Sequence, residues 1–442
     1  MLVFYKQTTK DGIKMKYLIS KRMLLISSIS FAFVTPVAFA TNGLAPTGLG
    51  QEHKAMGGAA VAHPVNTMSM ATNPASASFI DDGWDVEMEL FKPNRTIKRK
   101  DFPKLPGATF KGNEKSIFAI PGSGYKKQYN TKYAIGLTLY GNGGMNTEFK
   151  TSPVFPTGAT PPNHIAPFNG GTKTHSGVNL EQLFVSPTLG IKLNERHSLG
   201  LSINLIYQQF EAQGLEALTR NSKDAANFTG KGADSSTGIG ATIGWMGKFS
   251  ETTTIGASYR PKTKMSKFKK YAGLFPDGGR MDIPTTFSVG FSTQLTAKTT
   301  IAADIAQIYY SKVGAIGNSA QTPLPFGSND GPGFGWDDQT VIKLGVKHQL
   351  NPKLALMAGY NHGDSPVDEN DTFFNSLTPA VVEDHLSLGF DYKLNKNTSI
   401  IGSYTHTFSN TVKGNLANPI QPQPFDLTMD QDAIGIGYSV RF

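Results

Sequence analysis

Apolar residues alternate with small or polar residues along most of the chain from about Trp84 onwards. Between positions 199 and 208 one parity is apolar: Leu199, Leu201, Ile203, Leu205 and Tyr207. The other parity holds Gly200, Ser202, Asn204 and Gln208, and only Ile206 interrupts it. The same pattern recurs over 133–139, 386–392 and 434–442. Because successive side chains of a β-strand point to opposite faces, each run predicts a strand with one apolar and one polar face.

The length and the ends of these runs favour a membrane barrel over a soluble sandwich, which would show the same alternation. The runs have about ten residues, as a tilted strand needs to cross the hydrocarbon. The second face is rich in Gly, Ser, Thr and Asn, as suits a wet lumen. The apolar face often ends in an aromatic residue, as at Tyr140, Tyr207, Tyr259, Tyr360 and Tyr392. Such a sheet must close on itself, since lipid cannot satisfy an open edge.

Fourteen strands can be placed, an even number. Their expected starts are near Trp84, Ser116, Thr131, Val178, Arg196, Ser235, Thr252, Met281, Lys298, Phe334, Lys353, Val382, Thr398 and Met429. The connections between them alternate between short turns of a few residues and long loops, which is typical of outer-membrane barrels. The sequence therefore predicts an all-β, antiparallel, transmembrane barrel over residues 83–442, with the short turns in the periplasm and the long loops outside.

Residues 1–40 have the features of a secretory signal peptide. Lys14, Lys16, Lys21 and Arg22 precede an apolar run, and Ala38-Phe39-Ala40 supplies a small-x-small cleavage site. Of the formal charge of +9, this segment carries six Lys or Arg and one Asp, so the rest of the chain is only weakly basic. That weak charge excludes nucleic acid as a partner. We expect the mature protein to begin at Thr41 and to lie in the outer membrane of a Gram-negative cell.

Residues 41–82 do not alternate. They are rich in Gly, Ala and other small residues, carry little charge and contain frequent helix and strand breakers. A fourteen-stranded barrel leaves a lumen too wide for its own side chains to fill. We therefore expect this segment to form a compact plug, or hatch, inside the barrel. The alternative is a flexible periplasmic tail.

Several short motifs, taken in order, resemble the FadL family of outer-membrane transporters for long-chain fatty acids and aromatic hydrocarbons. They are Gly48-Leu49-Gly50, Asn73-Pro74-Ala75, 257–262, 342–345, 350–353, 358–360, 364–367 and 383–389. One departure is Met357, where the resemblance leads us to expect Arg. The resemblance implies a hydrophobic small-molecule substrate, a hatch whose Asn73, Pro74 and Ala75 take part in gating, and lateral exit through the wall.

Apolar residues with helical spacing occur in two of the predicted outer loops. One loop carries Leu215 and Leu218, and the other carries Phe268, Tyr271, Leu274 and Phe275. An apolar molecule needs an apolar surface to bind, so these six residues are candidates for substrate capture, and the resemblance places an outer groove there. The alternative is that the two loops pack on each other. The neighbouring lysines at 267, 269 and 270 are candidates for contact with lipopolysaccharide or with a substrate carboxylate.

Arg260, Lys262 and Lys264 share the parity of Gly256 and Ser258, which predicts that they face the lumen. A cation on such a wall can hold the carboxylate head group of a substrate. The alternative is an internal ion pair with the plug, with Asp304 or with Asp391.

The sequence gives little support for catalysis. Neither His385 nor His406 has a matched Ser partner, and we find no phosphate-binding loop or metal-ligand spacing, so we expect no enzyme activity, no cofactor and no metal.

The other expected partners are the outer membrane with its lipopolysaccharide and the barrel-assembly machinery, and we expect a monomer. The alternative functions are a diffusive porin for small solutes and a surface adhesin or phage receptor using loops 142–177 and 311–333.

Overall fold

The computed structural model describes residues 42–100, 107–149, 175–415 and 425–442. The expected signal peptide and its cleavage site lie outside these residues, as does most of the loop at 142–177. Within the described residues, no helix is both long enough and apolar enough to cross a membrane.

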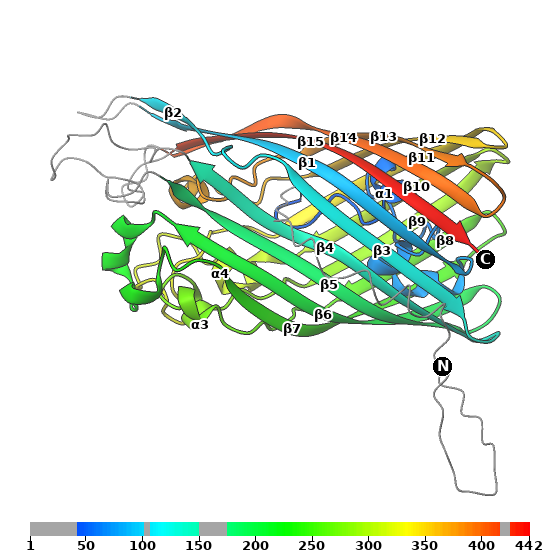
Figure 1. The fold of residues 1–442 in the computed structure, drawn as a ribbon, viewed down its shortest axis with the longest axis horizontal. Coiled ribbons are helices and arrows are strands. Elements are labelled where there is room, and N and C mark those ends of the chain that lie inside the picture. The colour runs from blue at the N-terminus through cyan, green and yellow to red at the C-terminus, as the bar shows by residue number, and fades with distance from the viewer. Residues whose placement is uncertain (1–41, 101–106, 150–174, 416–424) are drawn as a thin grey trace, which may run out of the picture. The chain divides into compact units, whose positions relative to one another are not determined.

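Fourteen antiparallel strands form a closed ring (Figure 1). In chain order they are β1 (Gly83–Arg99), β3 (Phe118–Gln128), β4 (Tyr133–Phe149), β5 (Ser176–Lys192), β6 (His197–Gln213), β7 (Asp234–Lys248), β8 (Thr253–Arg260), β9 (Thr286–Thr296), β10 (Thr299–Ile308), β11 (Gln339–Asn351), β12 (Leu354–Gly363), β13 (Asp384–Lys393), β14 (Thr398–Lys413) and β15 (Phe425–Arg441). The short strand β2 (Ala108–Lys111) pairs with β1 alone and is not part of the ring. The expected fourteen-stranded barrel is confirmed.

The ring closes where β1 pairs with β15, from Gly83 opposite Arg441 to Arg99 opposite Phe425. Each strand starts within five residues of its expected position, and long and short connections alternate as expected. Several strands are longer than expected: β1, β4, β5, β6 and β15 each have 17 residues. The extra length continues the wall beyond its apolar band.

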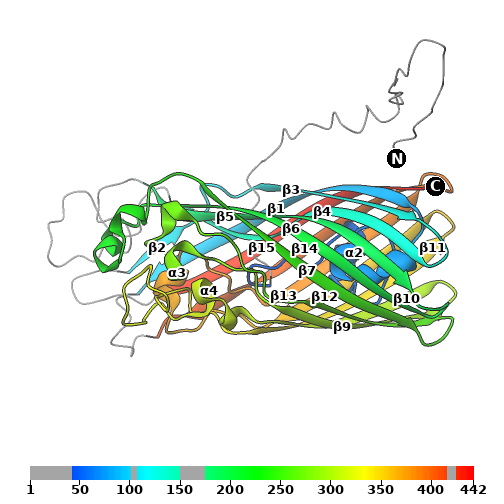
Figure 2. The ribbon, with the colours of Figure 1, turned by 90° about the horizontal axis from the view of Figure 1, so that it is seen from below.

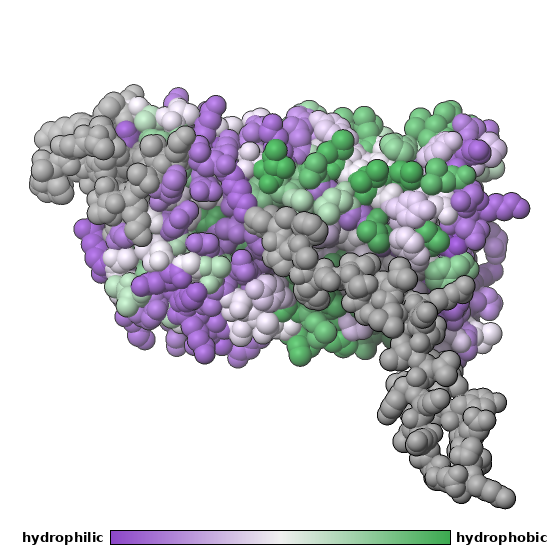
Figure 3. Space-filling view, in the orientation of Figure 1, coloured by the Kyte–Doolittle hydropathy of each residue, from purple (hydrophilic) through white to green (hydrophobic). Residues whose placement is uncertain are grey.

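The apolar parity faces outward. Leu199, Leu201, Ile203, Leu205 and Tyr207 are each about 40% exposed, whereas Ile206, on the other parity, is buried. On β1 the outward positions change from Val86, Met88 and Leu90 to Lys92, Asn94, Thr96 and Lys98 along the strand. Figure 3 shows the resulting apolar belt over the strands and the hydrophilic surface at the long-loop end. A band of this kind matches a bilayer.

Residues 42–82, here called the hatch, lie inside the ring (Figures 1 and 2). Three short helices organise them: α1 (Gln51–Ala55), α2 (Ser69–Thr72) and the 3₁₀ helix η1 (Pro74–Ser78). Glycines of the inner wall let the hatch backbone approach closely. A Cβ at position 200 would overlap the Pro74 backbone, and one at position 389 would overlap the Ala55 side chain. The small inward residues thus make room for the hatch rather than for water.

The long-loop end is closed by an apolar cluster beneath and between the loops. Its short helices are η2 (Glu216–Asn221), η3 (Ala225–Asn227), η4 (Lys269–Tyr271), α3 (Pro276–Gly279), η5 (Tyr310–Lys312), α4 (Gly314–Gly317) and α5 (Thr372–Asn375). This cluster, here called the loop core, also receives Leu44 from the hatch.

Candidate functional site

One part of the hatch is held to the wall by buried charges. Lys54 forms an ion pair of 2.6 Å with Glu89 of β1, and both side chains are nearly inaccessible. Glu52 forms an ion pair of 2.5 Å with Lys347 of β11, which also contacts Asp391 of β13 at 3.2 Å. Both ion pairs therefore attach helix α1 of the hatch to the barrel wall.

Carboxylates of the wall also bind backbone N–H groups of the hatch. Asp304 of β10 accepts from Ala60 and Val61 at 2.6 and 3.0 Å. Glu87 and Asp85 of β1 accept from the backbone N–H groups of hatch residues 51 and 67, both within 2.9 Å. Hydrogen bonds to an ionised acceptor are about twice as strong as neutral ones, so these contacts fix the hatch backbone.

Asn73, Pro74 and Ala75 lie together against the other side of the wall. Asn73 is fully buried, its Oδ1 accepts from the Ala75 N–H at 3.0 Å, and its Nδ2 donates to the carbonyls of Val61 and Trp245 at 2.7 and 3.1 Å. Pro74 occupies the first turn of η1, where its missing N–H costs nothing. The motif therefore starts η1 and joins it to β7.

A cavity of about 110 Å³ lies between the hatch and the wall. Ala45, Pro46, Gly48, Leu49, Ala71 and Thr72 of the hatch line one side. Asn142, Thr242, Ser258, Arg260, Thr286, Ser288, Ile308 and Lys343 are among the residues that line the other. Two cations thus face a small cavity whose other walls are apolar or neutral.

Arg260 faces this cavity without an acidic partner among the described residues. Its guanidinium donates to Asn142 at 2.8 Å and to Thr286 at 3.3 Å, and it lies over the Phe184 ring at 5.6 Å from the centroid. Its Nε–H is buried and has no acceptor within the described part of the chain. The alternative ion pairs are not formed: Asp304 binds the hatch backbone and Asp391 contacts Lys347. This guanidinium can accommodate an added anion.

Lys262 and Lys264 do not face the lumen, so the expectation that they line it with Arg260 is wrong. β8 ends at Arg260, and Met265 pairs with Gly238 one position out of the register set by Tyr259 and Ile243. The extra residue reverses the parity. Thr263 and Met265 consequently turn inward and are buried, whereas Lys262 and Lys264 are exposed.

The six residues expected to capture substrate belong to the loop core and offer no exposed groove. Leu215, Phe268, Tyr271, Leu274 and Phe275 are buried, and Leu218 packs against them half-buried. Three of them contact the Phe210 ring: the ring centroids of Phe268, Tyr271 and Phe275 lie 5.7, 4.9 and 4.7 Å from its centroid. The two loops pack on each other, the alternative that the sequence left open.

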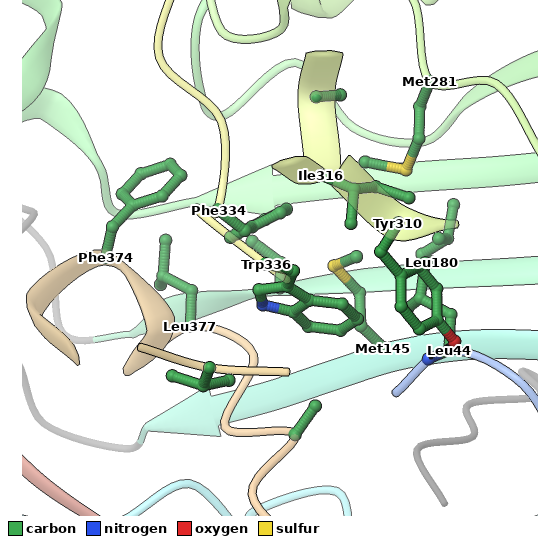
Figure 4. Close-up of a cluster of buried hydrophobic side chains, with 14 of the residues drawn as sticks. Leu44, Met145, Leu180, Met281, Tyr310, Ile316, Phe334, Trp336, Phe374 and Leu377 are labelled. Carbon is green, nitrogen blue, oxygen red and sulfur yellow. Dashed lines mark hydrogen bonds between the residues drawn. The ribbon is translucent and has the colours of Figure 1, made fainter. Parts of the chain in front are cut away.

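Hydroxyl groups of two tyrosines hold the loop core in place. Tyr271 accepts from the Ala212 N–H at 3.0 Å and donates to the Gly232 carbonyl at 2.9 Å, and burial raises the pKa of its hydroxyl to about 12. Tyr310 donates to the Asn42 carbonyl at 2.6 Å and accepts from Leu44 N–H at 2.9 Å, and burial likewise raises its pKa. Figure 4 shows Tyr310 beside Trp336 and Leu44. Tyr310 therefore links the hatch to the loop core.

The hydrogen-bonded wall is interrupted beside β4. β3 pairs with β4 only from Gly122 to Gln128, while β4 continues to Phe149. Pro121, which has no N–H, stands where this pairing stops. Beyond it Arg95 of β1 reaches across, donating to Asn146 at 2.9 Å and to the Lys115 carbonyl at 2.6 Å. Between Tyr140 and Thr147 of β4 these side-chain contacts take the place of a strand ladder, and farther along the backbone of residues 112–114 bonds to that of Glu148.

A closed barrel with an apolar outer belt and an internal hatch defines an outer-membrane β-barrel transport protein. The chain belongs to the family of outer membrane protein transport proteins (OMPP1/FadL/TodX), whose family model matches residues 24–442. The family resemblance seen in the sequence is thus confirmed, and the family consists of transport proteins rather than enzymes.

Solved structures with the same fold include three at low sequence identity. The Pseudomonas putida toluene transporter TodX is 19% identical, with a TM-score of 0.63 over 90% of this chain and 99% of that one. The Ralstonia pickettii toluene transporter TbuX is 18% identical, with a TM-score of 0.60 over 90% and 99%. A Pseudomonas aeruginosa FadL homologue is 16% identical, with a TM-score of 0.65 over 90% and 100%. No curated protein sequence matches the chain.

The residues that hold the hatch are not among those predicted from the sequence. Asp85, Glu87 and Glu89 alternate with the apolar Val86, Met88 and Leu90, so three carboxylates on one inward face were visible in the pattern. Lys343 and Lys347 likewise occupy one parity of their strand. Charges on the small-residue parity were the available signal, but their partners in the hatch could not be read from spacing.

Proposed function

We propose that the protein takes up hydrophobic molecules that carry a carboxylate, such as long-chain fatty acids, across the outer membrane. The observation that carries the proposal is the half-buried guanidinium of Arg260, whose Nε–H is buried without an acceptor; it has no acidic partner among the described residues and lines a cavity between hatch and wall. A carboxylate would complete its hydrogen bonds and supply the missing charge, and Lys343 lines the same cavity. A neutral hydrocarbon would do neither.

Entry would pass through the loop core. Because five of the six candidate capture residues are buried and Leu218 is half-buried, binding there requires the two loops to part and expose them. Exit would be lateral, at the interrupted ladder beside Pro121, because few main-chain hydrogen bonds have to break there. Asn142, which lines the cavity and binds Arg260, is an unpaired extra residue of β4 next to the end of that ladder. This neighbourhood supports a path from cavity to wall.

The Arg260 site is tested by calorimetric binding of hexadecanoate and of hexadecanol to the detergent-solubilised protein. Arg260→Gln should weaken hexadecanoate binding by roughly 10-fold or more and leave hexadecanol unchanged, since a hydrogen bond to a charged group contributes about 1.5–3 kcal/mol. Lys262→Gln removes the same charge from an exposed position and should change neither. Equal binding of acid and alcohol by the unmodified protein would refute the preference for carboxylates.

The hatch would act as the gate, with Asn73, Pro74 and Ala75 in the part that moves. Deleting residues 42–82 should leave a folded barrel that conducts ions in planar bilayers but no longer delivers hexadecanoate. A diffusive porin predicts the opposite for the intact protein: large steady conductance that no hydrophobic ligand alters. An ion-tight deletion variant would contradict the gating role.

A further inference from the structure

An open groove of about 750 Å³ lies on the lipid-facing side of the barrel, over the neighbouring strands β12 to β15 and β1 (Figure 1). It is centred on an outward position of β14 that is a glycine, in a row where the strands on both sides carry large apolar side chains. Along the strand pairing this row is Leu356, Phe390, Gly402, Ile436 and Met88. Its volume falls in the range of sites that hold small molecules, roughly 300–1,000 Å³.

The groove ends in a row of polar side chains on the side of the long loops. Lys92, Asp432 and His406 lie opposite one another on β1, β15 and β14, one outward position beyond the residues that line the groove. The Tyr404 hydroxyl donates to Asp432 at 2.7 Å, and Nδ1 of His406 lies 2.9 Å from the same carboxylate. This row marks the level at which the apolar belt gives way to the head-group region of the membrane.

Further lysines follow on the outward face of these strands, closer to the loops. Lys98 of β1 and Lys413 of β14 lie opposite the same residue of β15, and Lys111 of the adjoining β2 lies one outward position nearer the belt. All three side chains are exposed, as is Lys92. Lys92 and Lys98 are about 20 Å apart along the strand, at about 3.3 Å per residue. That span suits a ligand with several anionic groups.

The carboxylates on the same face are bound within the wall. Asp426 forms an ion pair of 3.1 Å with Lys100, and Asp430 accepts from Nδ2 of Asn94 at 2.8 Å. Asp432 is satisfied by its two neighbours, as described above. The lysines at 92, 98, 111 and 413, here called the lysine face, form no hydrogen-bonded ion pair among the described residues. The wall above the groove therefore offers unpaired cations to an external anion.

We propose that the groove and the lysine face together form a binding site for lipopolysaccharide, the anionic glycolipid of the outer leaflet. An acyl chain lies in the groove over Gly402, and phosphates of the sugar head group bind Lys92 and the lysines nearer the loops. The site differs from the lysines at 267, 269 and 270 that the sequence suggested for this contact. It is also independent of the transported substrate.

The arrangement of charge favours lipopolysaccharide over two other occupants. A phospholipid carries its phosphate at one level and reaches only the first lysine, whereas lipopolysaccharide carries phosphates at several levels of its sugars. A second copy of the chain, related by a two-fold axis, would place the same surface of both copies together. The lysine face would then meet another lysine face, which is electrostatically unfavourable.

Native mass spectrometry of the mature protein, purified in detergent and stripped of lipid, measures the binding of added lipid A, the phosphorylated and acylated disaccharide of lipopolysaccharide. Gly402→Ile fills the groove, and the new Cβ would meet the end of the Phe390 side chain, which can swing towards lipid. We expect roughly 10-fold weaker binding. Ala303→Ile adds the same side chain to the belt between Leu344 and Phe291 and should change nothing. Equal binding by the two variants would overturn the role of the groove.

The lysine face is tested by the combined change Lys92→Gln, Lys98→Gln and Lys413→Gln, which should weaken lipid A binding roughly 10-fold or more. The matched control removes the same charge at exposed positions of the short turns, through Lys353→Gln, Lys393→Gln and Lys396→Gln, and should bind normally. Equal loss in both triple variants would refute a site at the lysine face.

Two further measurements need no variant, so they decide the proposal even if Gly402→Ile fails to fold, which the mobility of unboiled protein in electrophoresis reveals. Lipid A without its phosphates should bind the unmodified protein roughly 10-fold more weakly than lipid A. Phosphatidylglycerol should do the same. Equal binding of either probe would overturn the specificity for lipopolysaccharide, and a lipid-free dimer that Gly402→Ile dissociates would assign the groove to a second copy.

Discussion

Lys54 of the hatch and Glu89 of β1 form an ion pair of 2.6 Å in which both side chains are about 5% exposed. The pair is closed off from water by the wall on one side and the hatch on the other. Removing one partner would leave the other charge buried and alone, while removing both would leave a neutral contact.

Lys54→Met should therefore destabilise the hatch by about 3–5 kcal/mol, whereas the double change Lys54→Met with Glu89→Met should recover most of that loss. Urea unfolding followed by tryptophan fluorescence measures both. Lys192→Met is the matched control, because Lys192 pairs with the exposed Glu195 and such a surface pair contributes about 0–1 kcal/mol. A double variant no more stable than the single one would show that the loss of stability does not come from leaving the Glu89 charge unpaired.

Gly200→Ala should displace η1 from the wall. The added Cβ would overlap the backbone of Pro74, and overpacking of this kind costs about 1–3 kcal/mol. We expect a higher ion conductance in planar bilayers with normal assembly of the barrel. Gly437→Ala is the control, since its Cβ would meet Gln51 Cγ at an ordinary 3.6 Å and should not alter conductance. Equal conductance in the two variants would argue against a sealing role for this contact.

Phe268→Ala should loosen the loop core without unfolding the barrel. The Phe268 ring is fully buried, with its centroid 5.7 Å from that of Phe210, and a large-to-small change in such a core costs about 3–5 kcal/mol. Limited proteolysis should cut the loops at 214–233 and 261–285 sooner, while the strands remain protected. Leu324→Ala, at an exposed loop position, should leave the cleavage rate unchanged.

The loop that contains Asp371 should lose stability as the pH rises. Burial raises the pKa of this carboxyl to about 6 from an ordinary 3.8, although Ser319 and the Ala320 N–H donate to it at 2.9 and 3.0 Å. Since the folded loop favours the protonated form, its stability is complete below about pH 4 and falls as the pH passes through about 6.

A pKa that rises from 3.8 to about 6 corresponds to a loss of roughly 3 kcal/mol. Hydrogen exchange of residues 364–383 between pH 4.5 and 7.5, corrected for the intrinsic rate, measures it. Asp371→Asn should remove the pH dependence, and Asp330→Asn, at an exposed position, should preserve it. A pH dependence that survives in Asp371→Asn would assign the effect to another group.

The strands, their faces and their order could be predicted from the sequence because lipid on one side of the wall imposes a two-residue period on every strand. Leu199 to Tyr207 show this directly, and Ile206 points inward as its parity requires. The alternation of long loops and short turns could be predicted as well, because it depends only on the number and order of the strands. Local spacing was sufficient wherever the environment of a residue depended on its own strand alone.

The errors lie where two distant parts of the chain meet. One extra residue between Arg260 and Met265 reversed the direction of Lys262 and Lys264, and a parity rule cannot detect such an irregularity. The spacing of Phe268, Tyr271 and Phe275 correctly marked an apolar set, but whether another loop covers it depends on Phe210 and Leu215, far away in sequence. The partners of Glu89 and Asp304 in the hatch were invisible for the same reason.

The pairing of β1 with β15 along all 17 residues of each strand constrains the biogenesis of the protein. The hatch precedes every strand of the barrel in the sequence, so it is synthesised before them. The barrel closes around it only when β15 pairs with β1. Closure therefore joins segments more than 300 positions apart, which places this step among the slow ones in folding. Until the barrel closes, the hatch is exposed and must not aggregate. The many small residues of 64–80 leave little apolar surface for aggregation during this period.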